Sequence, residues 1–373
     1  MLETEASRSR LLIFGHPMGA GWKTIDALED LPYADITDAS NRMLFRSSPE
    51  EFFSLYAGAT TIINAHLCEE LLESALIYLA DHPGRKIVLA GRFSDVRIEQ
   101  AKNLAESVSV DLVAKIAAEP RLFRARIEEG RIVAFVPSGG FAGPSEAFGS
   151  CLAAGYGVRG AQHWTQLWKT DILAPALELG VRKRDALYGV ARELARRTAQ
   201  PLNWSDAGVL AGVPGITVRE WAQLLERLCA LRIVPAVNLK PQRRTLDRPK
   251  LYWRHPGFGL WLSGQMISPD DAVCRAFFEN TVYLALTDCY PSARILHFMD
   301  TNRVTCPLVV EQDGAYRAFY IYENSKQRDQ ALRHHRSLVK TGRFAPAAGM
   351  VAYEGMTQTA SVHYETPEGA GEL

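Results

Sequence analysis

The sequence lacks several features that would assign it to a simple class of protein. Its six cysteines are scattered and form no C-x-x-C pair, which excludes a zinc or disulfide framework built on cysteine spacing. Neither charge is in excess, since 42 Lys and Arg residues stand against 42 Asp and Glu residues, so nucleic-acid binding can be argued only from local clusters. No apolar run approaches the ~18–20 residues of a membrane span, and the charged start of the chain shows no signal-peptide pattern. We therefore expect reduced thiols and a cytoplasmic location.

The sequence does contain enough apolar residues for a large core. Its 373 residues are 47% apolar and 23% charged, which predicts a globular chain of two or three domains. In the first third, apolar strands at 10–15, 60–65 and 85–92 are separated by helical segments. This alternation predicts a parallel sheet covered on both faces, with polar residues and glycines at the strand ends where such sheets bind ligands.

The rest of the chain suggests further domains. Residues 95–200 are mainly helical by pattern, apart from a strand and Gly/Pro-rich loop at 131–150. Residues 203–237 predict helix, turn at Pro214-Gly215, helix and an extended stretch that 250–254 can pair with, which is the order of a winged helix. In that unit Thr217 is expected to cap the second helix, with Glu220 completing a capping box. The last third predicts a helix at 271–290 and then strands, with a hairpin turn at Gln312-Asp313-Gly314.

A candidate phosphate-binding loop, GHPMGAGWKT, lies between the first strand and the first helical segment. It contains the residue types of the G-x-x-x-x-G-K-[ST] motif at Gly15, Gly19, Gly21, Lys23 and Thr24. However, Trp22 separates Gly21 from Lys23, and one extra residue rotates the following side chains by roughly 100° on a helix. Two interpretations stay open, namely a bulged cradle that takes ATP with Mg²⁺ and a glycine-rich turn that only preserves the fold.

With these segments in order, the chain resembles a known family. The segments are ADITDASNRMLFRSSPEEFF (34–53), IINAHLCEELLESALIYLADHPGRKIVLAGR (62–92), ITVREWAQLLERLCALRIV (216–234), RPKLYWRHPGFGLWLSG (248–264), FFENTVYLAL (277–286) and YIYENS (320–325). Over roughly residues 10–355 they are similar to a prokaryotic ATP-binding family that joins an AAA-type ATPase core to a winged helix and a C-terminal restriction-endonuclease-like domain of unknown function.

The resemblance implies an α/β fold class and a division of the chain into domains. The expected domains are a P-loop AAA-type parallel-sheet domain, a helical connecting region, a winged helix, a restriction-endonuclease-like α/β domain and a flexible tail. Their expected bounds are 1–125, 126–200, 201–265, 266–358 and 359–373.

The chain departs from this family at the positions that carry its chemistry. The acidic pair after the second strand would fall on Asn64 and Ala65, and neither an amide nor a methyl group can replace a carboxylate in holding Mg²⁺ and orienting a water. The family's Thr-Gly-Ser after the third strand is here Ala90-Gly91-Arg92. These losses indicate a domain that does not hydrolyse nucleotides, while a strand-end cap remains the simple structural role for Asn64.

The C-terminal domain departs from the family pattern in the same way. Nucleases of this fold use acidic residues and a lysine around a metal ion. The acids would fall on Pro307 and Ile321 and the lysine on Glu323, so that only Glu279 on the preceding helix is retained. A relocated metal site formed by Glu311 and Glu323 is the alternative to a domain without metal. We therefore expect no catalytic residue and no metal ligand in this chain.

A basic run is the strongest candidate for an interaction surface. It lies where the wing of a winged helix would contact a phosphate backbone, and the preceding helix adds Arg219 and Arg227. The residues of the run are Lys240, Arg243, Arg244, Arg248 and Lys250. A solvated loop or a protein-contact wing are the alternatives to DNA binding.

Three functional hypotheses follow from these observations. The first is a catalytically degenerate ATPase-family protein that acts as a scaffold or regulatory binding protein for a protein partner, a homologous ATPase or DNA. The second is a remodelling ATPase with an atypical phosphate loop and a DNA-contacting winged helix. The third is ATP binding without turnover, as a stabilising ligand or a switch. An oligomer is compatible with each of them.

Overall fold

A computed structural model describes most of the chain, and the chain divides into two compact units. The described residues are 9–15, 32–58, 60–68, 70–93, 95–116, 123–129, 131–137, 158–239, 245–265, 272–353 and 360–367. The first unit comprises Met1–Pro120, Thr165–Arg184 and Leu224–Ala230, and the second comprises Arg121–Trp164, Asp185–Gln223 and Leu231–Leu373.

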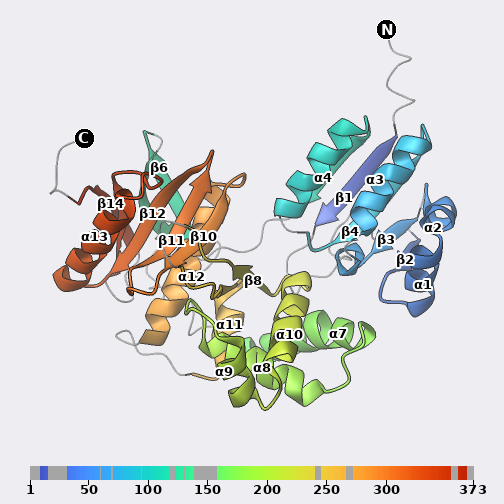
Figure 1. The fold of residues 1–373 in the computed structure, drawn as a ribbon. Helices are drawn as coiled ribbons and strands as arrows, with labels where there is room; N and C mark the ends of the chain where they lie inside the picture. Colours follow the sequence, from blue (N-terminus) through green and yellow to red (C-terminus); the bar gives the residue numbers. More distant parts are fainter. Residues whose placement is uncertain are drawn as a thin grey trace, which may run out of the picture. The chain divides into compact units, whose positions relative to one another are not determined.

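A five-stranded, all-parallel sheet forms the first unit, as the alternation of strand and helix signals predicts (Figure 1). Its strand order is β2-β3-β4-β1-β5. The strands are β1 (Arg10–Gly15), β2 (Tyr33–Asp35), β3 (Thr61–Ile63), β4 (Lys86–Gly91) and β5 (Asp111–Ile116). The parallel pairing of β1 with β4 is in register from Arg10 opposite Lys86 to Gly15 opposite Gly91, so these strands end at the same level.

Among the helices of the first unit, α1 (Ala39–Ser47) and α2 (Pro49–Tyr56) are short and begin at side-chain caps. α1 begins after Asp38, whose carboxylate accepts a hydrogen bond from the Ser40 amide, and α2 has proline in its first turn. α3 (Leu71–Asp81) and α4 (Asp95–Ser107) pack against each other. Two later segments complete the unit: residues 165–184, with the π-helix η4 (Trp168–Leu173) and α7 (Ala174–Glu178), and residues 224–230.

The helical middle of the chain contains α6 (Val158–Leu167), α8 (Arg184–Arg196), α9 (Trp204–Ala211), α10 (Gly215–Arg227) and α11 (Pro256–Ser263). α9 ends at Gly212, whose φ of 68° is the left-handed conformation that glycine adopts without strain. α10 begins at Gly215, so Thr217 lies inside its first turn and is not the capping residue that the sequence predicts. The reason is that the carbonyl of Pro214 already accepts the first helical hydrogen bond, from the Val218 amide.

The predicted pairing after α10 is confirmed. β8 (Leu231–Val234) and β9 (Lys250–Trp253) are antiparallel, with Leu231 opposite Trp253. Asn280 on α12 (Ala272–Cys289) binds the end of β9. Its side-chain amide accepts a hydrogen bond from the Trp253 N–H at 2.7 Å and donates one to the Trp253 carbonyl at 2.8 Å. A buried amide that satisfies both backbone groups fixes this strand on the helix.

A mixed seven-stranded sheet forms the rest of the second unit, in the order β10-β11-β12-β13-β14-β7-β6. The helices α12 and α13 (Ser325–Val339) pack on it (Figure 1). Its strands are β6 (Phe123–Glu128), β7 (Arg131–Pro137), β10 (Arg294–Met299), β11 (Thr305–Gln312), β12 (Ala315–Tyr322), β13 (Ala348–Ala352) and β14 (Ala360–Glu365). The turn between β11 and β12 has φ of 52° at Asp313 and 77° at Gly314, as the Asp-Gly signal predicts.

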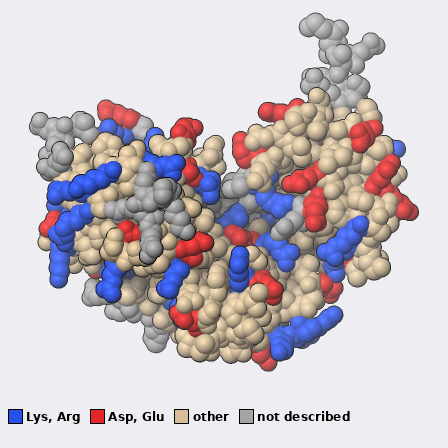
Figure 2. Space-filling model, in the orientation of Figure 1, with Lys and Arg blue, Asp and Glu red and all other residues tan. Residues whose placement is uncertain are grey.

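Two segments differ from the sequence patterns. Residues 111–128 contain β5 and β6, where the pattern favours helix, because each strand finds a partner from a distant part of the chain. Residues 360–365, expected within a flexible tail, form β14, which pairs with both β13 and β7. None of the helices in the described ranges combines the length and the hydropathy that a bilayer span requires. On the face shown in Figure 2, both units carry acidic and basic side chains interspersed.

Candidate functional site

The candidate site is the carboxyl edge of the parallel sheet in the first unit. The chain leaves β1 toward the edge strand β2, whereas it leaves β4 in the opposite direction and passes β1 to reach β5. This reversal is a topological switch point, the place where open α/β sheets bind ligands. Gly15, Asp35, Asn64 and Arg92 each end or directly follow one of the four strands β1 to β4. Of the predicted phosphate loop, only Gly15 can be placed here, since Gly19, Gly21, Lys23 and Thr24 lie outside the described residues.

The Asn64 side chain binds a neighbouring strand end. Its Nδ2 donates to Oδ1 of Asp35 at 2.9 Å, and the same oxygen accepts from the Thr37 amide at 2.8 Å. Asn64 has a φ of 57°, a left-handed conformation in which asparagine is favoured among residues with a side chain, and it makes no side-chain cap to the 3-10 helix η3 (Ala65–Leu67). The amide therefore joins β3 to β2 instead of capping the helix.

Ala65 offers no room for a catalytic group. Its side chain is only 2% exposed, inside the turn that follows β3. A carboxylate at this position would have to be removed from water, which is costly. The two positions that correspond to the family's acidic pair are thus an amide bound to Asp35 and a methyl group in the core. Within the ranges that the structure describes, no group of three His, Cys, Asp or Glu residues could hold a metal ion.

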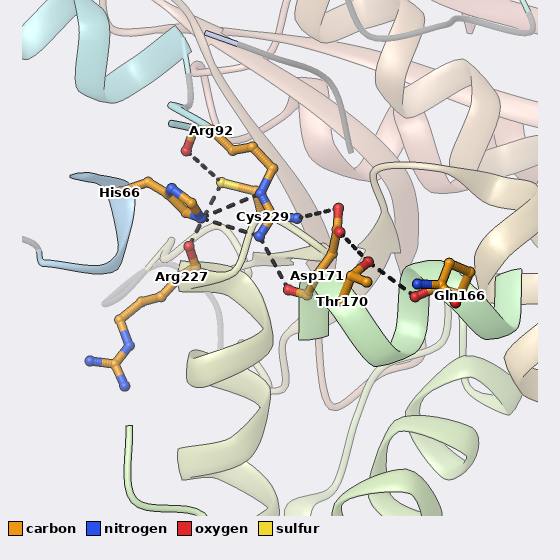
Figure 3. A network of polar contacts seen from close by, with 7 residues as sticks. All are labelled: His66, Arg92, Gln166, Thr170, Asp171, Arg227 and Cys229. Carbon is orange, nitrogen blue, oxygen red and sulfur yellow. Dashed lines mark hydrogen bonds and ion pairs between the residues drawn. The ribbon is translucent and has the colours of Figure 1, made fainter. Parts of the chain in front are cut away.

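Arg92, directly after β4, is the centre of the polar contacts at this edge. Its Nη1 lies 3.1 Å from Oδ2 of Asp171, and its Nη2 donates to the Asp171 backbone carbonyl at 3.1 Å. The ion pair is nearly removed from water, with 4% of the Arg92 side chain and 15% of the Asp171 side chain exposed. Figure 3 shows the guanidinium between the carboxylate of Asp171 and the ring of His66. Asp171 comes from η4, so the pair ties residues 165–184 to the sheet edge.

The contact with Arg92 fixes the role of the His66 ring. Nε2 of His66 lies 3.3 Å from Nε and 3.2 Å from Nη2 of Arg92, and a guanidinium can only donate. Nε2 must therefore be the acceptor, which requires that it carry no proton. The neighbouring Gly91 allows this close approach, because a Cβ there would lie 2.8 Å from Nδ1 of His66. Glycine is required here by the packing of the imidazole, not by the backbone conformation.

Two further residues support Arg92 and Asp171. Cys229 has a φ of 57°, which is strained for cysteine, and its thiol donates to the Arg92 carbonyl at 3.0 Å. Thr170 has a hydroxyl 2.7 Å from Oδ1 of Asp171 and 3.0 Å from the Gln166 carbonyl. Arg227 contributes its backbone carbonyl, 3.7 Å from the Cys229 sulfur, and its side chain extends away from the residues drawn (Figure 3). The arrangement is a structural network that holds later segments of the chain on the sheet edge.

The residues of the predicted basic surface do not share one environment. Arg219 and Arg248 are exposed, whereas Lys240, Arg243 and Arg244 lie outside the described residues. Lys250 is buried, with its Nζ 2.6 Å from Oε1 of Glu279, so it does not have the solvent-facing position that a wing contact to DNA requires. Its burial follows from its place at the first position of β9, which packs on α12.

Three of the four positions where the resemblance would place nuclease catalytic groups line one cavity. Glu279, Pro307 and Ile321 line it, and Glu323 lies beside it in an ion pair with Arg275, with Nη1 and Oε2 3.2 Å apart. Glu311 pairs instead with Arg294 at 3.1 Å. The two glutamates that could have formed a relocated metal site therefore bind different arginines, which does not support such a site.

Replacement of Asn64 by aspartate should destabilise the first unit in a pH-dependent way. The new carboxylate would face Asp35 at hydrogen-bond distance, and two such groups cannot both be ionised without cost. We expect a loss of about 1–3 kcal/mol at neutral pH, which shrinks toward about pH 4 as the folded variant takes up a proton that the unfolded chain does not bind. Urea denaturation at neutral pH and at about pH 4 measures this loss of stability. Asn64→Gly suits the left-handed conformation and should show a loss that does not depend on pH, and equal behaviour of both variants would contradict the prediction.

Comparison with known proteins gives one match. Residues 169–268 match a domain family described as a domain of unknown function (DUF8612). This range begins in η4, two residues before Asp171, and ends after α11. Searches of curated proteins and of solved structures found no match.

Proposed function

We propose that this protein is a catalytically degenerate member of the AAA-type ATPase family that its sequence resembles, and that it acts as a scaffold or regulatory binding protein. The observation that carries the proposal is that side chains at the carboxyl edge of the parallel sheet are already bound or buried. The amide of Asn64 is committed to Asp35, Ala65 is buried, and Arg92 is committed to Asp171. A nucleotide hydrolase needs carboxylates free to hold magnesium and to orient a water at this edge.

The architecture supports the finer parts of the proposal. The switch point at β1 supports an ATPase-like core for the first unit. The helices α9 and α10 followed by the antiparallel pair β8–β9 support a winged helix. The convergence of Glu279, Pro307 and Ile321 on one cavity supports descent of the C-terminal sheet from a nuclease-like domain.

An apolar surface supports a protein as the partner. Val209, Leu210 and Ile216 are 80%, 66% and 69% exposed around the turn between α9 and α10. Large apolar side chains that gather on a surface commonly mark an interaction site. DNA remains a partner to be tested through the exposed Arg219 and Arg248.

Capture of partners from the native cell tests the proposal. Wild type and a Leu210→Asp/Ile216→Asp variant are compared, with Ile77→Asp, an exposed apolar residue on α3, as the control. A protein retained by wild type and the control but lost by the double variant supports the scaffold. An Arg219→Gln/Arg248→Gln variant that loses salt-sensitive duplex binding would identify DNA instead. If all variants retain the same set of molecules, this surface does not recruit the partner.

Nucleotide binding is the second candidate function, either with hydrolysis as a remodelling ATPase or without it. It is favoured by the position of Gly15 at the end of β1, opposite Gly91 on β4, since both strands lie at the switch point. If ATP with Mg²⁺ binds, a concentration about 100-fold above Kd should add about 2.7 kcal/mol of stability and raise Tm. We expect no ATP hydrolysis above that of the Lys23→Ala variant, measured by phosphate release. Hydrolysis that Lys23→Ala abolishes would overturn the degenerate assignment.

A further inference from the structure

A cavity of about 340 Å³ lies in the second unit, among β9, β10, β11, β12 and the helices α12 and α13. Its volume is at the lower end of the range for pockets that hold small molecules. The walls include Lys250, Arg275, Glu279, His297, Gln330 and His334. The proposed scaffold function uses none of these groups, so it does not account for the charged and polar walls of the cavity.

Two cations line the cavity, and both retain donor capacity. The Lys250 ammonium has three N–H groups; one is directed at Glu279, 2.6 Å away, and another at the Pro307 carbonyl at the long distance of 3.5 Å. The Arg275 guanidinium has five N–H groups and pairs with Glu323, which does not line the cavity. Among the charged lining residues, two cations thus stand against the single carboxylate of Glu279, which favours an anion.

His297 lines the same cavity as a neutral group. Its Nε2 lies 2.8 Å from the Arg248 carbonyl, and since a carbonyl only accepts, Nε2 carries the proton. Burial, together with the nearby charge of Lys250, lowers the pKa of His297 to about 3, so the ring is neutral and Nδ1 is a bare acceptor. The residue is 1% exposed, and no donor in the described part of the chain reaches Nδ1. Because Nδ1 is enclosed by protein atoms, the ring gives the wall a neutral surface that does not repel an anion by charge.

Other chemistries fit this cavity less well. Burial raises the pKa of the Cys306 thiol to about 12, so the lining cysteine stays protonated and is not a nucleophile at neutral pH. Glu279, the lining carboxylate, already binds Lys250 and the Tyr252 hydroxyl through Oε1. A hard cation needs more oxygen ligands than such a wall supplies.

We propose that this cavity binds a small organic anion, whose acid group is held by Lys250 and Arg275. The acid group is a carboxylate or a phosphate monoester, because both accept from ammonium and guanidinium groups. The volume suits a compact molecule and not a nucleic-acid segment. The inference does not depend on the scaffold function, since it concerns different residues and a different class of ligand.

Calorimetry and thermal unfolding of the full chain test the proposal, with four probes: malate, glycerol 3-phosphate, inorganic phosphate and neutral glycerol. We expect malate or glycerol 3-phosphate to bind and raise Tm, and to bind at least about tenfold more tightly than inorganic phosphate or glycerol. The comparison of malate with glycerol 3-phosphate distinguishes a carboxylate from a phosphate. A duplex oligonucleotide is included as the macromolecular alternative.

Variants assign the binding to the cavity. Arg275→Gln, at a partly exposed residue, and Gln330→Glu, which adds a negative charge to the wall, should each weaken binding at least about tenfold. The control Arg333→Gln removes a cation from an exposed position of α13 that does not line the cavity, and it should leave the affinity unchanged. The proposal is overturned if no organic anion binds at about 10 mM. It is also overturned if Arg333→Gln acts like Arg275→Gln, or if only the duplex binds in an Arg275-dependent manner.

Discussion

Substitution of Arg92 by methionine is expected to lower the free energy of unfolding of the first unit by about 3–5 kcal/mol. The reason is that Asp171 would keep its charge at a nearly buried position while losing its 3.1 Å partner. The His66 ring would also lose the two Arg92 donors at 3.2 and 3.3 Å. The backbone carbonyl of Asp171 would lose its hydrogen bond from Arg92 Nη2. Urea denaturation measures the loss, and hydrogen exchange over residues 86–93 and 165–173 assigns it to the sheet edge.

An exposed ion pair of the same sheet supplies the matched control. Arg10 at the start of β1 lies 2.8 Å from Asp111 at the start of β5, but the two side chains are 53% and 36% exposed. Arg10→Met should therefore cost no more than about 1 kcal/mol, because solvent screens this pair. Arg92→Met/Asp171→Leu should recover most of the stability lost by the single change, since it removes both charges. Equal losses for Arg92→Met and Arg10→Met would show that burial does not govern the pair.

If the first unit is the degenerate ATPase domain proposed above, the Arg92 network explains how its sheet edge persists without magnesium chemistry. In the family that the sequence resembles, the residue at the position of Arg92 is a serine, which is small and polar. Arginine here reaches Asp171, 79 residues later in the chain, and η4 thereby becomes part of the first unit. A fold that has given up magnesium chemistry can use the same edge to hold a later segment, because the open end of a parallel sheet offers polar strand ends for either purpose.

The sequence predicts the strands of the first unit through their composition. β1, β3 and β4 are short apolar runs bounded by turn residues, and a parallel sheet buries such runs on both faces. β2 is only three residues long and gives no such signal, and it becomes a strand because β3 supplies its hydrogen bonds, which local propensity does not record. β6 (FRARIE) alternates apolar and charged residues, which is a strand pattern within a segment that otherwise favours helix.

The candidate site could be predicted only in part. The sequence identifies the positions Asn64, Ala65 and Arg92, because each follows an apolar strand. It does not reveal that Asn64 binds Asp35 or that Arg92 binds Asp171, since neither spacing corresponds to a turn of helix or to one strand face. Lys250 shows the same limit. Its place in a basic run predicts an exposed wing, whereas the structure buries it because β9 packs on α12.

Substitution of Lys250 by methionine should have a comparably large effect in the second unit. Glu279, whose side chain is 15% exposed, would lose the ammonium at 2.6 Å and retain the hydrogen bond from the Tyr252 hydroxyl at 2.7 Å. An uncompensated carboxylate at such a position typically costs about 3–5 kcal/mol. We expect a loss of this size in the urea transition of the second unit, with weakened protection of residues 250–253 in hydrogen exchange, because the Lys250–Glu279 pair joins β9 to α12.

Two variants separate the buried charge from the loss of the side chain itself. Lys250→Met/Glu279→Gln leaves an uncharged acceptor for Tyr252 and should recover most of the stability, because the carboxylate that lacked a partner is gone. Arg294→Met removes a cation from the pair with Glu311, where the arginine side chain is 70% exposed, and should cost no more than about 1 kcal/mol. If the double variant is as unstable as Lys250→Met, the carboxylate without a partner is not the source of the loss, and the ammonium stabilises this unit through another contact, such as that with the Pro307 carbonyl.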